Sequence, residues 1–345
     1  MIQPGFFDLS NRYTKLDELG DPLPKIEAVV DWERFRPSLS KVREKPRKSA
    51  AGRPPFDAVL MFKVLVLQSF YNLSDEQVEF QIRDRYSFCR FLGLTPEGRV
   101  PDAKTVWLFR EELTKLDLID RLFADLNSQI ESAGYIPRKG QIVDASIVEA
   151  PRQRNSRDEN EKIKSGETPA EWSEPKRRQK EMDARWTQKH KKSYYGYKNH
   201  IGVDHAYKII RRWLPTDASV HDSQVFFDLL DDSNSSGDVW ADSAYWSGDK
   251  KEELAALGYR SHIHRKGVRG KPLNGRSAEA NRKRSKIRAR VEHVFGQQAL
   301  FGRYIRTIGW ARARLKIGMS NLAYNMKRLA WLVDHVPPPG RVVEC

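Results

Sequence analysis

The chain has 345 residues, of which 39% are hydrophobic, so it is long enough for two domains and can bury a core. It carries 61 Lys and Arg against 46 Asp and Glu, a formal net charge of +15. Residues 260–316 hold 17 basic and two acidic side chains, so a polyanion is the expected partner of this region.

Two cysteines give no disulfide framework or metal-ligand spacing, and no stretch reaches membrane-spanning length. We therefore expect a cytoplasmic protein.

Residues 1–53 are expected to form an N-terminal arm and a basic linker. Residues 24–35 fit a short amphipathic helix, and we expect residues 41–53 (KVREKPRKSAAGR) to form a flexible connector. This connector is either a solvated linker or an arm that contacts DNA.

Residues 54–134 predict an all-α domain. The apolar run 54–71 is too long for a strand and predicts a buried helix with proline in its first turn. Ser74 opens a capping box with Gln77, and Asp102 can cap a helix over 103–116. Shorter helices are expected over 86–91, ending at Gly93, and over 118–132. Such a module could read DNA as a helix-turn-helix does, but most small helical bundles bind no DNA.

Strand signals begin at residues 141–150 (QIVDASIVEA), an apolar, β-branched run interrupted by Asp144. Residues 151–192, with 13 basic and eight acidic side chains, predict a charged surface insertion. Further strands are expected over 194–203, 208–214, 238–245 and 259–264, with short helices over 222–230 and 248–257. A long basic helix over 278–298 and a last helix over 314–333 follow. The order predicts an α/β domain over 135–334 with a mixed five-stranded sheet, and a tail over 335–345.

Three acidic side chains stand out in this domain. Asp144 lies within the first strand, Asp242 at the end of the fourth, and Glu292 on the long helix. The carboxylate of Asp144 must pair with a cationic side chain, lie at the exposed edge of the strand or hold a metal. We expect a metal, because three clustered carboxylates suit hard divalent ions such as Mg²⁺. Arg288, one helical turn before Glu292, can orient that carboxylate or contact a phosphate. A carboxylate-metal site beside a basic surface indicates a nucleic-acid substrate.

The blocks VDASIVEAPR, VWADSAYWS and RARVEHVFG, around Asp144, Asp242 and Glu292, resemble the three acidic motifs of bacterial DDE transposases. They are most similar to the "insertion sequence five" group, and residues 50–330 share the resemblance. It implies a ribonuclease-H-like fold and cutting and rejoining of DNA at terminal inverted repeats. It also implies two Mg²⁺ ions on the three carboxylates, with Mn²⁺ able to substitute, a homodimer on double-stranded DNA, and association with the bacterial nucleoid.

One departure concerns the related fourth-group transposases, which carry a Tyr, Arg, Glu and Lys signature around the glutamate. Arg288 and Glu292 fit this signature, whereas its Tyr and Lys positions fall at Ser285 and Ala299. Those two contacts are therefore absent or supplied by other residues.

The remaining candidates have alternative interpretations. His221 and Asp222 form a second small block, with either a catalytic role or a role in capping the helix after them through Asp222. Trp246 can stack on an unpaired base or pack in the core. The basic residues expected to contact DNA are Arg282, Lys283, Arg284, Lys286, Arg290 and Arg303.

Two other functions fit the same sequence. One is a non-catalytic repressor derived from a transposase, and the other is a ribonuclease-H-like DNA nuclease or resolvase. Strand cleavage in the presence of Mg²⁺ separates an enzyme from a repressor. Strand transfer and dependence on the inverted repeat separate a transposase from a resolvase.

Overall fold

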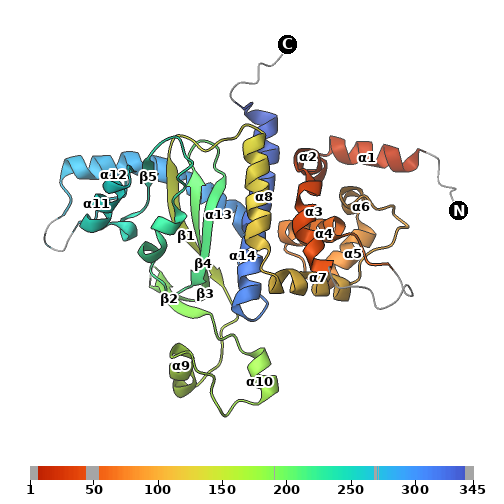
Figure 1. Cartoon of the computed structure of the whole chain (residues 1–345), viewed down its shortest axis with the longest axis horizontal. Helices are drawn as coiled ribbons and strands as arrows, with labels where there is room; N and C mark the ends of the chain where they lie inside the picture. The colour runs from red at the N-terminus through yellow and green to blue at the C-terminus, as the bar shows by residue number, and fades with distance from the viewer. Residues whose placement is uncertain (1–6, 44–53, 190, 268–269, 271, 339–345) are drawn as a thin grey trace. The chain divides into compact units, whose positions relative to one another are not determined.

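The computed structural model describes residues 7–43, 54–189, 191–267, 270 and 272–338 (Figure 1). The chain divides into two compact units. One runs to Tyr135 and also includes the chain from Leu322 onward; the other is Ile136–Asn321. Most of the predicted basic connector, residues 44–53, lies outside the described residues. None of the described helices is both long and apolar enough to cross a membrane.

The first unit is entirely helical in its described residues. Its elements are α1 (Asp8–Glu18), α2 (Leu23–Val29), η1 (Trp32–Phe35), α3 (Arg36–Ser40), η2 (Lys41–Arg43), α4 (Ala58–Tyr71), α5 (Asp75–Asp84), α6 (Tyr86–Leu92), α7 (Ala103–Lys115), α8 (Ile119–Ser132) and the end of α14 (Trp310–His335). The capping box of Ser74 and the Asp102 cap are present as predicted. The prediction of proline in the first turn of α4 is wrong. The helix begins later, at Ala58, because the Asp57 carboxylate accepts hydrogen bonds from the amides of Val59 and Leu60.

Residues before the connector belong to the core of this helical unit. Trp32 and Phe35 are almost fully buried. Phe35 lies 5.1 Å from Phe62 between ring centroids, and Trp32 lies 5.5 Å from Phe91. The sequence interpretation placed residues 8–43 in a separate arm because short, mixed segments give weak helical periodicity. Aromatic packing across distant segments joins them to the unit instead.

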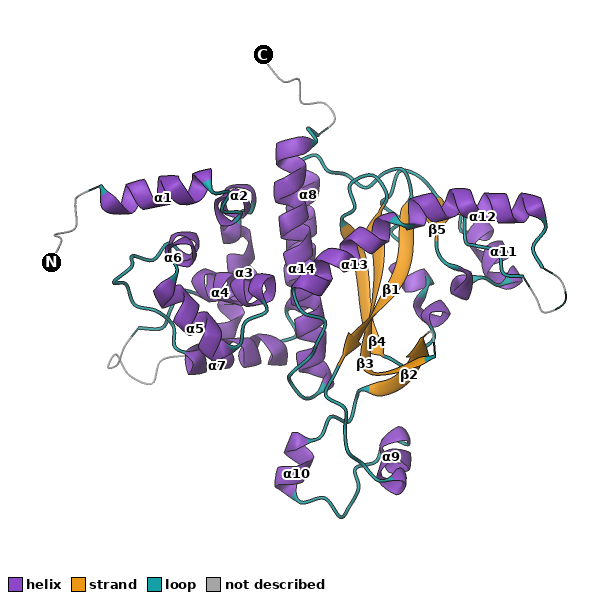
Figure 2. Cartoon of the chain, turned by 180° about the vertical axis from the view of Figure 1, so that it is seen from behind, coloured by secondary structure: helices purple, strands orange, loops and turns teal. Residues whose placement is uncertain are grey.

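The second unit holds the sheet and its covering helices (Figure 2). Its elements are β1 (Gln141–Glu149), α9 (Arg157–Lys164), α10 (Glu174–Gln179), β2 (Arg185–Lys189), β3 (Lys192–Asp204), β4 (Ile210–Asp217), η3 (Asp222–Val225), η4 (Phe227–Leu229), β5 (Asp238–Trp240), η5 (Ser243–Tyr245), α11 (Gly248–Ala256), β6 (Arg260–Ser261), α12 (Gly275–Arg288), α13 (Arg290–Leu300) and the start of α14.

The sheet is mixed and has the strand order β2-β3-β1-β5-β6, with β4 also paired to β3. Strand β1 is antiparallel to β3 and parallel to β5, so the two strands expected to carry Asp144 and Asp242 are neighbours, as predicted. Val143 points into an apolar cluster with η3, η4 and α11. Val148, on the other face, packs against Ala313 and Ile317 of α14.

Five predicted elements differ from the structure. The sheet has six strands because β2 forms inside the segment expected to be a charged insertion. Strand β5 ends at Trp240, and the fifth predicted strand is reduced to the two residues of β6. The segment 222–230 forms two 3-10 turns, η3 and η4, instead of a helix. The predicted helix 278–298 is two helices, α12 and α13, separated at Ala289.

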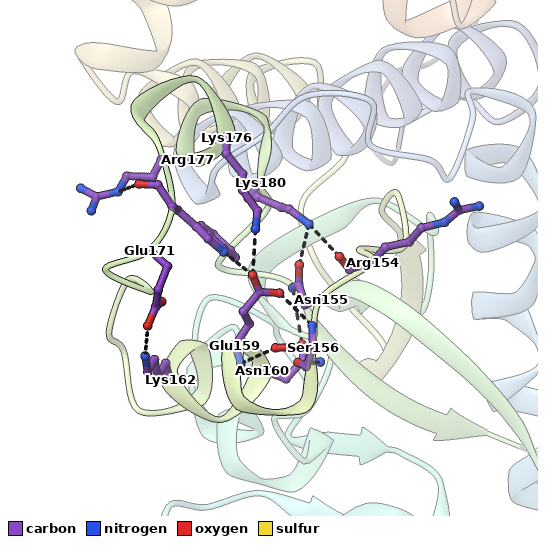
Figure 3. Close-up of polar contacts among 11 residues, drawn as sticks. Arg154, Asn155, Ser156, Glu159, Asn160, Lys162, Glu171, Lys176, Arg177 and Lys180 are labelled. Atoms are coloured by element: carbon purple, nitrogen blue, oxygen red, sulfur yellow. Dashed lines mark hydrogen bonds and ion pairs between the residues drawn. The ribbon is translucent and has the colours of Figure 1, made fainter.

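The remainder of the insertion folds around Glu159 and Trp172 (Figure 3). The Trp172 indole is 3% exposed and donates to Glu159 Oε1 at 2.5 Å. The Lys176 ammonium donates to the same oxygen at 2.8 Å, and Glu159 completes a capping box with Ser156 at the start of α9. This charged segment is therefore an ordered module with its own small core.

Candidate active site

Asp144 lies in the middle of β1, on the face that also carries Ser146 and Val148. The parallel register pairs Ile142 with Trp240, the last residue of β5, and the charge of Asp242, two residues later, acts on the Asp144 carboxyl group. Asp242 is held by the turn that follows the strand, because its Oδ1 accepts from the amide of Ala244 at 2.8 Å. The end of β5 therefore brings one carboxylate next to the other.

Arg288 bridges two of the predicted carboxylates. Its Nη1 donates to Asp144 Oδ2 at 2.6 Å, and its Nη2 lies 3.4 Å from Glu292 Oε1. Arg288 is the last residue of α12 and Glu292 the third of α13, so the contact crosses the break at Ala289. The Asp144 side chain is 13% exposed and that of Glu292 is 61% exposed. The guanidinium supplies the counter-charge for this site.

Asp144 keeps a raised pKa in spite of this ion pair. Burial raises the pKa of its carboxyl group to about 6, and the charges of Asp242 and Glu292 add to the effect. Arg288 and the amide of Ala145 act in the opposite direction. Three carboxylates thus share one electrostatic environment, in which burial outweighs the single nearby cation.

The donor set has the chemistry of a divalent-ion site, because carboxylate oxygens are the preferred ligands of hard cations. Within the described ranges, however, no group of three or more His, Cys, Asp or Glu side chains is close enough to hold a metal ion. The structure brings Arg288 to Asp144 and Glu292, and it does not close the three carboxylates into a cage. Asp144 Oδ2 would become available to a cation once the guanidinium turned away from it.

A buried amide network fixes α13 to the sheet next to this site. Asn199 of β3 and Asn321 of α14 exchange two side-chain hydrogen bonds, at 2.8 and 3.1 Å. Gln298 of α13 donates to Asn321 Oδ1 at 2.6 Å. The end of α13 is therefore joined to both a strand and a helix by uncharged groups.

Sequence reasoning missed a buried polar cluster on the opposite face of the sheet. Tyr245 is fully buried, and its hydroxyl has no hydrogen-bond partner in the described part of the chain. Burial raises its pKa well above the ordinary value, and the charges of Asp144, Asp222 and Asp242 contribute. Lys198 of β3 forms an ion pair with Asp222 at 2.8 Å. The alternation of side chains along β3 could have indicated that Lys198 faces this cluster. The position of Tyr245, three residues after Asp242, could have indicated that this tyrosine lies near it.

The predicted cap at Asp222 is wrong. His221 caps η3 instead, because its Nδ1 accepts from the amide of Ser223 at 3.3 Å, while Asp222 is engaged by Lys198.

Ser285, at the position of the signature tyrosine, has its hydroxyl 3.4 Å from His264 Nε2. Burial and the charge of Arg288 lower the pKa of His264, which places this histidine at the edge of the carboxylate site.

The residues predicted to contact DNA fall into two groups. Three arginines donate to backbone carbonyls within the unit: Arg284 to Ile263, Arg290 to His205 and Arg303 to Phe295. The side chains of Arg282, Lys283 and Lys286 are exposed, and Lys283 pairs with Glu279 at 3.0 Å. Trp246 is partly buried against the cluster that contains Tyr245.

Comparison with known proteins gives two family matches. A model described as Transposase DDE domain matches residues 136–326, and a model described as Transposase domain (DUF772) matches residues 11–112. Transposase DDE domains generally use divalent metal ions. Among solved structures, a cryo-EM structure of piggyBac transposase in a synaptic complex with hairpin DNA is similar at 12% identity and a TM-score of 0.47. The similarity covers 90% of this chain and 74% of that chain.

The first of these matches begins at the end of the helical unit and contains the whole sheet. It confirms the ribonuclease-H-like fold that the three acidic blocks implied. Because it covers more than half of the residues, the chain belongs to the transposase DDE domain family and is a DDE-type transposase.

Proposed function

We propose that this transposase cuts and rejoins the DNA of an insertion sequence of the "insertion sequence five" group at its terminal inverted repeats. The observation that supports the proposal is the Arg288 bridge between Asp144 and Glu292, with Asp242 in the turn that follows the neighbouring strand. The surplus positive charge of residues 260–316 suits a DNA partner. Coordinated cutting of two ends favours a homodimer on DNA.

In this proposal Asp144, Asp242 and Glu292 hold two Mg²⁺ ions, with Mn²⁺ as a substitute. When bound, such ions activate the attacking oxygen and stabilise the leaving oxygen of a phosphodiester. The carboxylates orient the reacting groups, since Asp242 is fixed by its turn and Asp144 by the strand. Arg288 leaves Asp144 and turns to a phosphate oxygen, which suits the planar fork of its guanidinium.

The reaction has two steps. Water attacks the phosphodiester at the transposon end, which yields a 3′-hydroxyl and a 5′-phosphate. That 3′-hydroxyl then attacks a phosphodiester of the target, forms the new bond and releases a target 3′-hydroxyl. Each step exchanges one P–O bond for another, so a covalent protein–DNA intermediate is not required.

The test uses a duplex that carries one transposon end, with the full chain and Mg²⁺. Wild type should nick this duplex, whereas Asp144→Asn, Asp242→Asn and Glu292→Gln should each lower the nicking rate by about 10³-fold or more, in the range found when catalytic groups are removed. DNA affinity should stay within a few-fold, because each change removes negative charge from the DNA-facing side. Retained cleavage by Asp144→Asn would reject the assignment.

The same assay separates the alternatives. A repressor derived from a transposase would bind the end and leave both strands intact. A nuclease or resolvase would cut duplexes that lack the inverted repeat and would form no joined product. The Asp144–Arg288–Glu292 contact favours the enzyme over the repressor.

A further inference from the structure

We propose that a DNA duplex held at Asp144 makes a second contact about 30 Å away, at a basic tip formed by the β2–β3 hairpin. We define the hairpin tip as Trp186, Lys189, Lys191 and Lys192. The proposal rests on the proposed function, because it takes the Asp144 site as the point where DNA is cut. It adds a phosphate-binding surface outside residues 260–316, where the sequence placed the basic contacts.

The length of β3 sets the distance. Asp144 is paired with Ile201, and Lys192 lies nine residues before Ile201 on the same strand. At about 3.3–3.4 Å per residue, this separation is about 30 Å. Successive base pairs of a duplex rise by about 3.4 Å, so the tip lies about nine base pairs from the cut if the duplex follows the strand.

Cationic side chains also occur along and beyond β1, in the direction of the hairpin tip. Ser146 and Val148 share the face of Asp144 and line a hollow together with Arg303 and Lys316. Past the end of β1, the Arg152 guanidinium lies over the Trp186 ring, 5.6 Å from its centroid. Positive side chains thus occur at three places: Arg288 next to Asp144, Arg303 and Lys316 beside Ser146 and Val148, and Arg152 beyond the end of β1.

Several acidic residues of the insertion are paired away from the tip. Glu159 and Glu171 pair with lysines inside the module (Figure 3), and Glu174 pairs with Arg178. Lys189, Lys191 and Lys192 are exposed, and the Trp186 side chain beside them is 47% exposed. The hairpin therefore presents three exposed lysines beside a half-exposed tryptophan.

The tip is also held in a defined position. Trp186 packs on Tyr195 across the hairpin, with centroids 5.2 Å apart. Just before β2, Glu181 Oε2 accepts from the Gly309 amide at 2.9 Å, and Asp183 Oδ2 accepts from the Trp310 amide at 2.8 Å. Both carboxylates thereby cap the start of α14. A rigid support lets the tip select a fixed distance along the duplex.

The experiment measures the affinity of the full chain for two duplexes that carry the cleavage site, without metal and as a function of salt. One extends about 20 base pairs on each side of the site and the other about six. Lys189→Gln/Lys191→Gln/Lys192→Gln should weaken binding to the long duplex by about 10²-fold at 0.1 M salt and reduce the salt slope by nearly three. Binding to the short duplex should not change.

Two controls make the result specific. Lys189→Arg/Lys191→Arg/Lys192→Arg keeps the charge and should bind the long duplex as wild type does. Arg157→Gln/Lys162→Gln/Lys164→Gln removes the same charge from α9 and should leave affinity for the long duplex within about twofold. Unchanged melting temperatures would establish that the exposed substitutions leave the fold intact.

Equal weakening on both duplexes, no weakening on either, or equal weakening by the α9 variant would each overturn the proposal. The outcome is independent of catalysis. Cleavage by Asp144→Asn would reject the active site while the length-dependent binding could still be measured. Loss of cleavage in Asp144→Asn with no length dependence would reject the hairpin contact alone.

Discussion

The carboxylate site and the charged insertion contain similar ion pairs with opposite consequences. Asp144 accepts from Arg288 at 2.6 Å, yet burial raises its pKa to about 6. Glu159 accepts from Lys176 at 2.8 Å, and hydrogen bonds from Lys176 and Trp172 lower its pKa to about 2. The cation is equally near in both places. The difference arises because burial and two further carboxylates act on Asp144, whereas Glu159 accepts hydrogen bonds from Lys176, Trp172 and the amide of Ser156.

This comparison separates two uses of charge. In the insertion, ionised groups hold a surface module together around one tryptophan. In the sheet, the Asp144 carboxylate is buried close to two further carboxylates, where its ionised form is unfavourable. Residues that act on a ligand are expected in an environment like that of Asp144, where burial and nearby charges shift the pKa.

The largest loss of stability is expected when the buried tryptophan of the insertion is removed. Trp172→Ala removes the only large aromatic group at the centre of the described insertion module and should cost about 3–5 kcal/mol, as large-to-small core changes do. The loss should be confined to residues 151–184, seen as faster amide hydrogen exchange there. Equal acceleration of exchange in β1 would show that the module and the sheet unfold together.

A smaller effect should appear in the pH dependence of stability. The pKa of Asp144 is about 6 in the folded chain against 3.8 for an ordinary aspartate, so the folded state binds this proton more tightly. The contribution of this group to the free energy of unfolding therefore falls as pH rises from about 4 to about 6.

Without metal, the stability of Asp144→Asn relative to wild type should thus increase by up to about 3 kcal/mol over this range, at 1.36 kcal/mol per pKa unit. Urea unfolding at four pH values in a chelating buffer measures the difference. A constant difference would contradict the raised pKa. Adding Mg²⁺ at pH 7 should raise the melting temperature of wild type alone.

Tyr245→Phe tests the cluster on the other face of the sheet. Its buried hydroxyl has no partner among the described residues, so its removal should be neutral or stabilise the metal-free chain by about 1 kcal/mol. Chemical denaturation measures the change. Tyr197→Phe is a matched comparison at a second buried tyrosine, whose pKa burial also raises. A clear destabilisation by Tyr245→Phe alone would reveal a bonded hydroxyl.

The smallest effect is expected for Glu159→Gln. The lowered pKa of Glu159 means that its contribution to stability is present above about pH 4.5 and is lost as pH falls towards about 2. Because the contact faces solvent, the melting temperature at pH 7 should fall by no more than a few degrees, and high salt should reduce the difference. A difference that persists in 1 M salt would indicate that packing, not charge, is lost.

The sequence predicted the candidate site best where a charged residue stands in an apolar segment. Asp144 interrupts an apolar strand, and the order of the elements predicted that β1 and β5 are neighbours. It was uninformative for β2, whose five residues (RWTQK) have no buried side chain and owe their conformation to pairing with β3. The break at Ala289 has no glycine or proline beside it, so local sequence did not predict it.

That break has a consequence for how the site can change shape. In one continuous helix, the spacing between Arg288 and Glu292 would be fixed by the helical repeat. With two helices, a few degrees of bending at Ala289 moves Arg288 while Gln298 stays bonded to Asn321. The angle between α12 and α13 therefore sets the distance from Arg288 to Glu292 independently of the end of α13 that is bonded to the sheet.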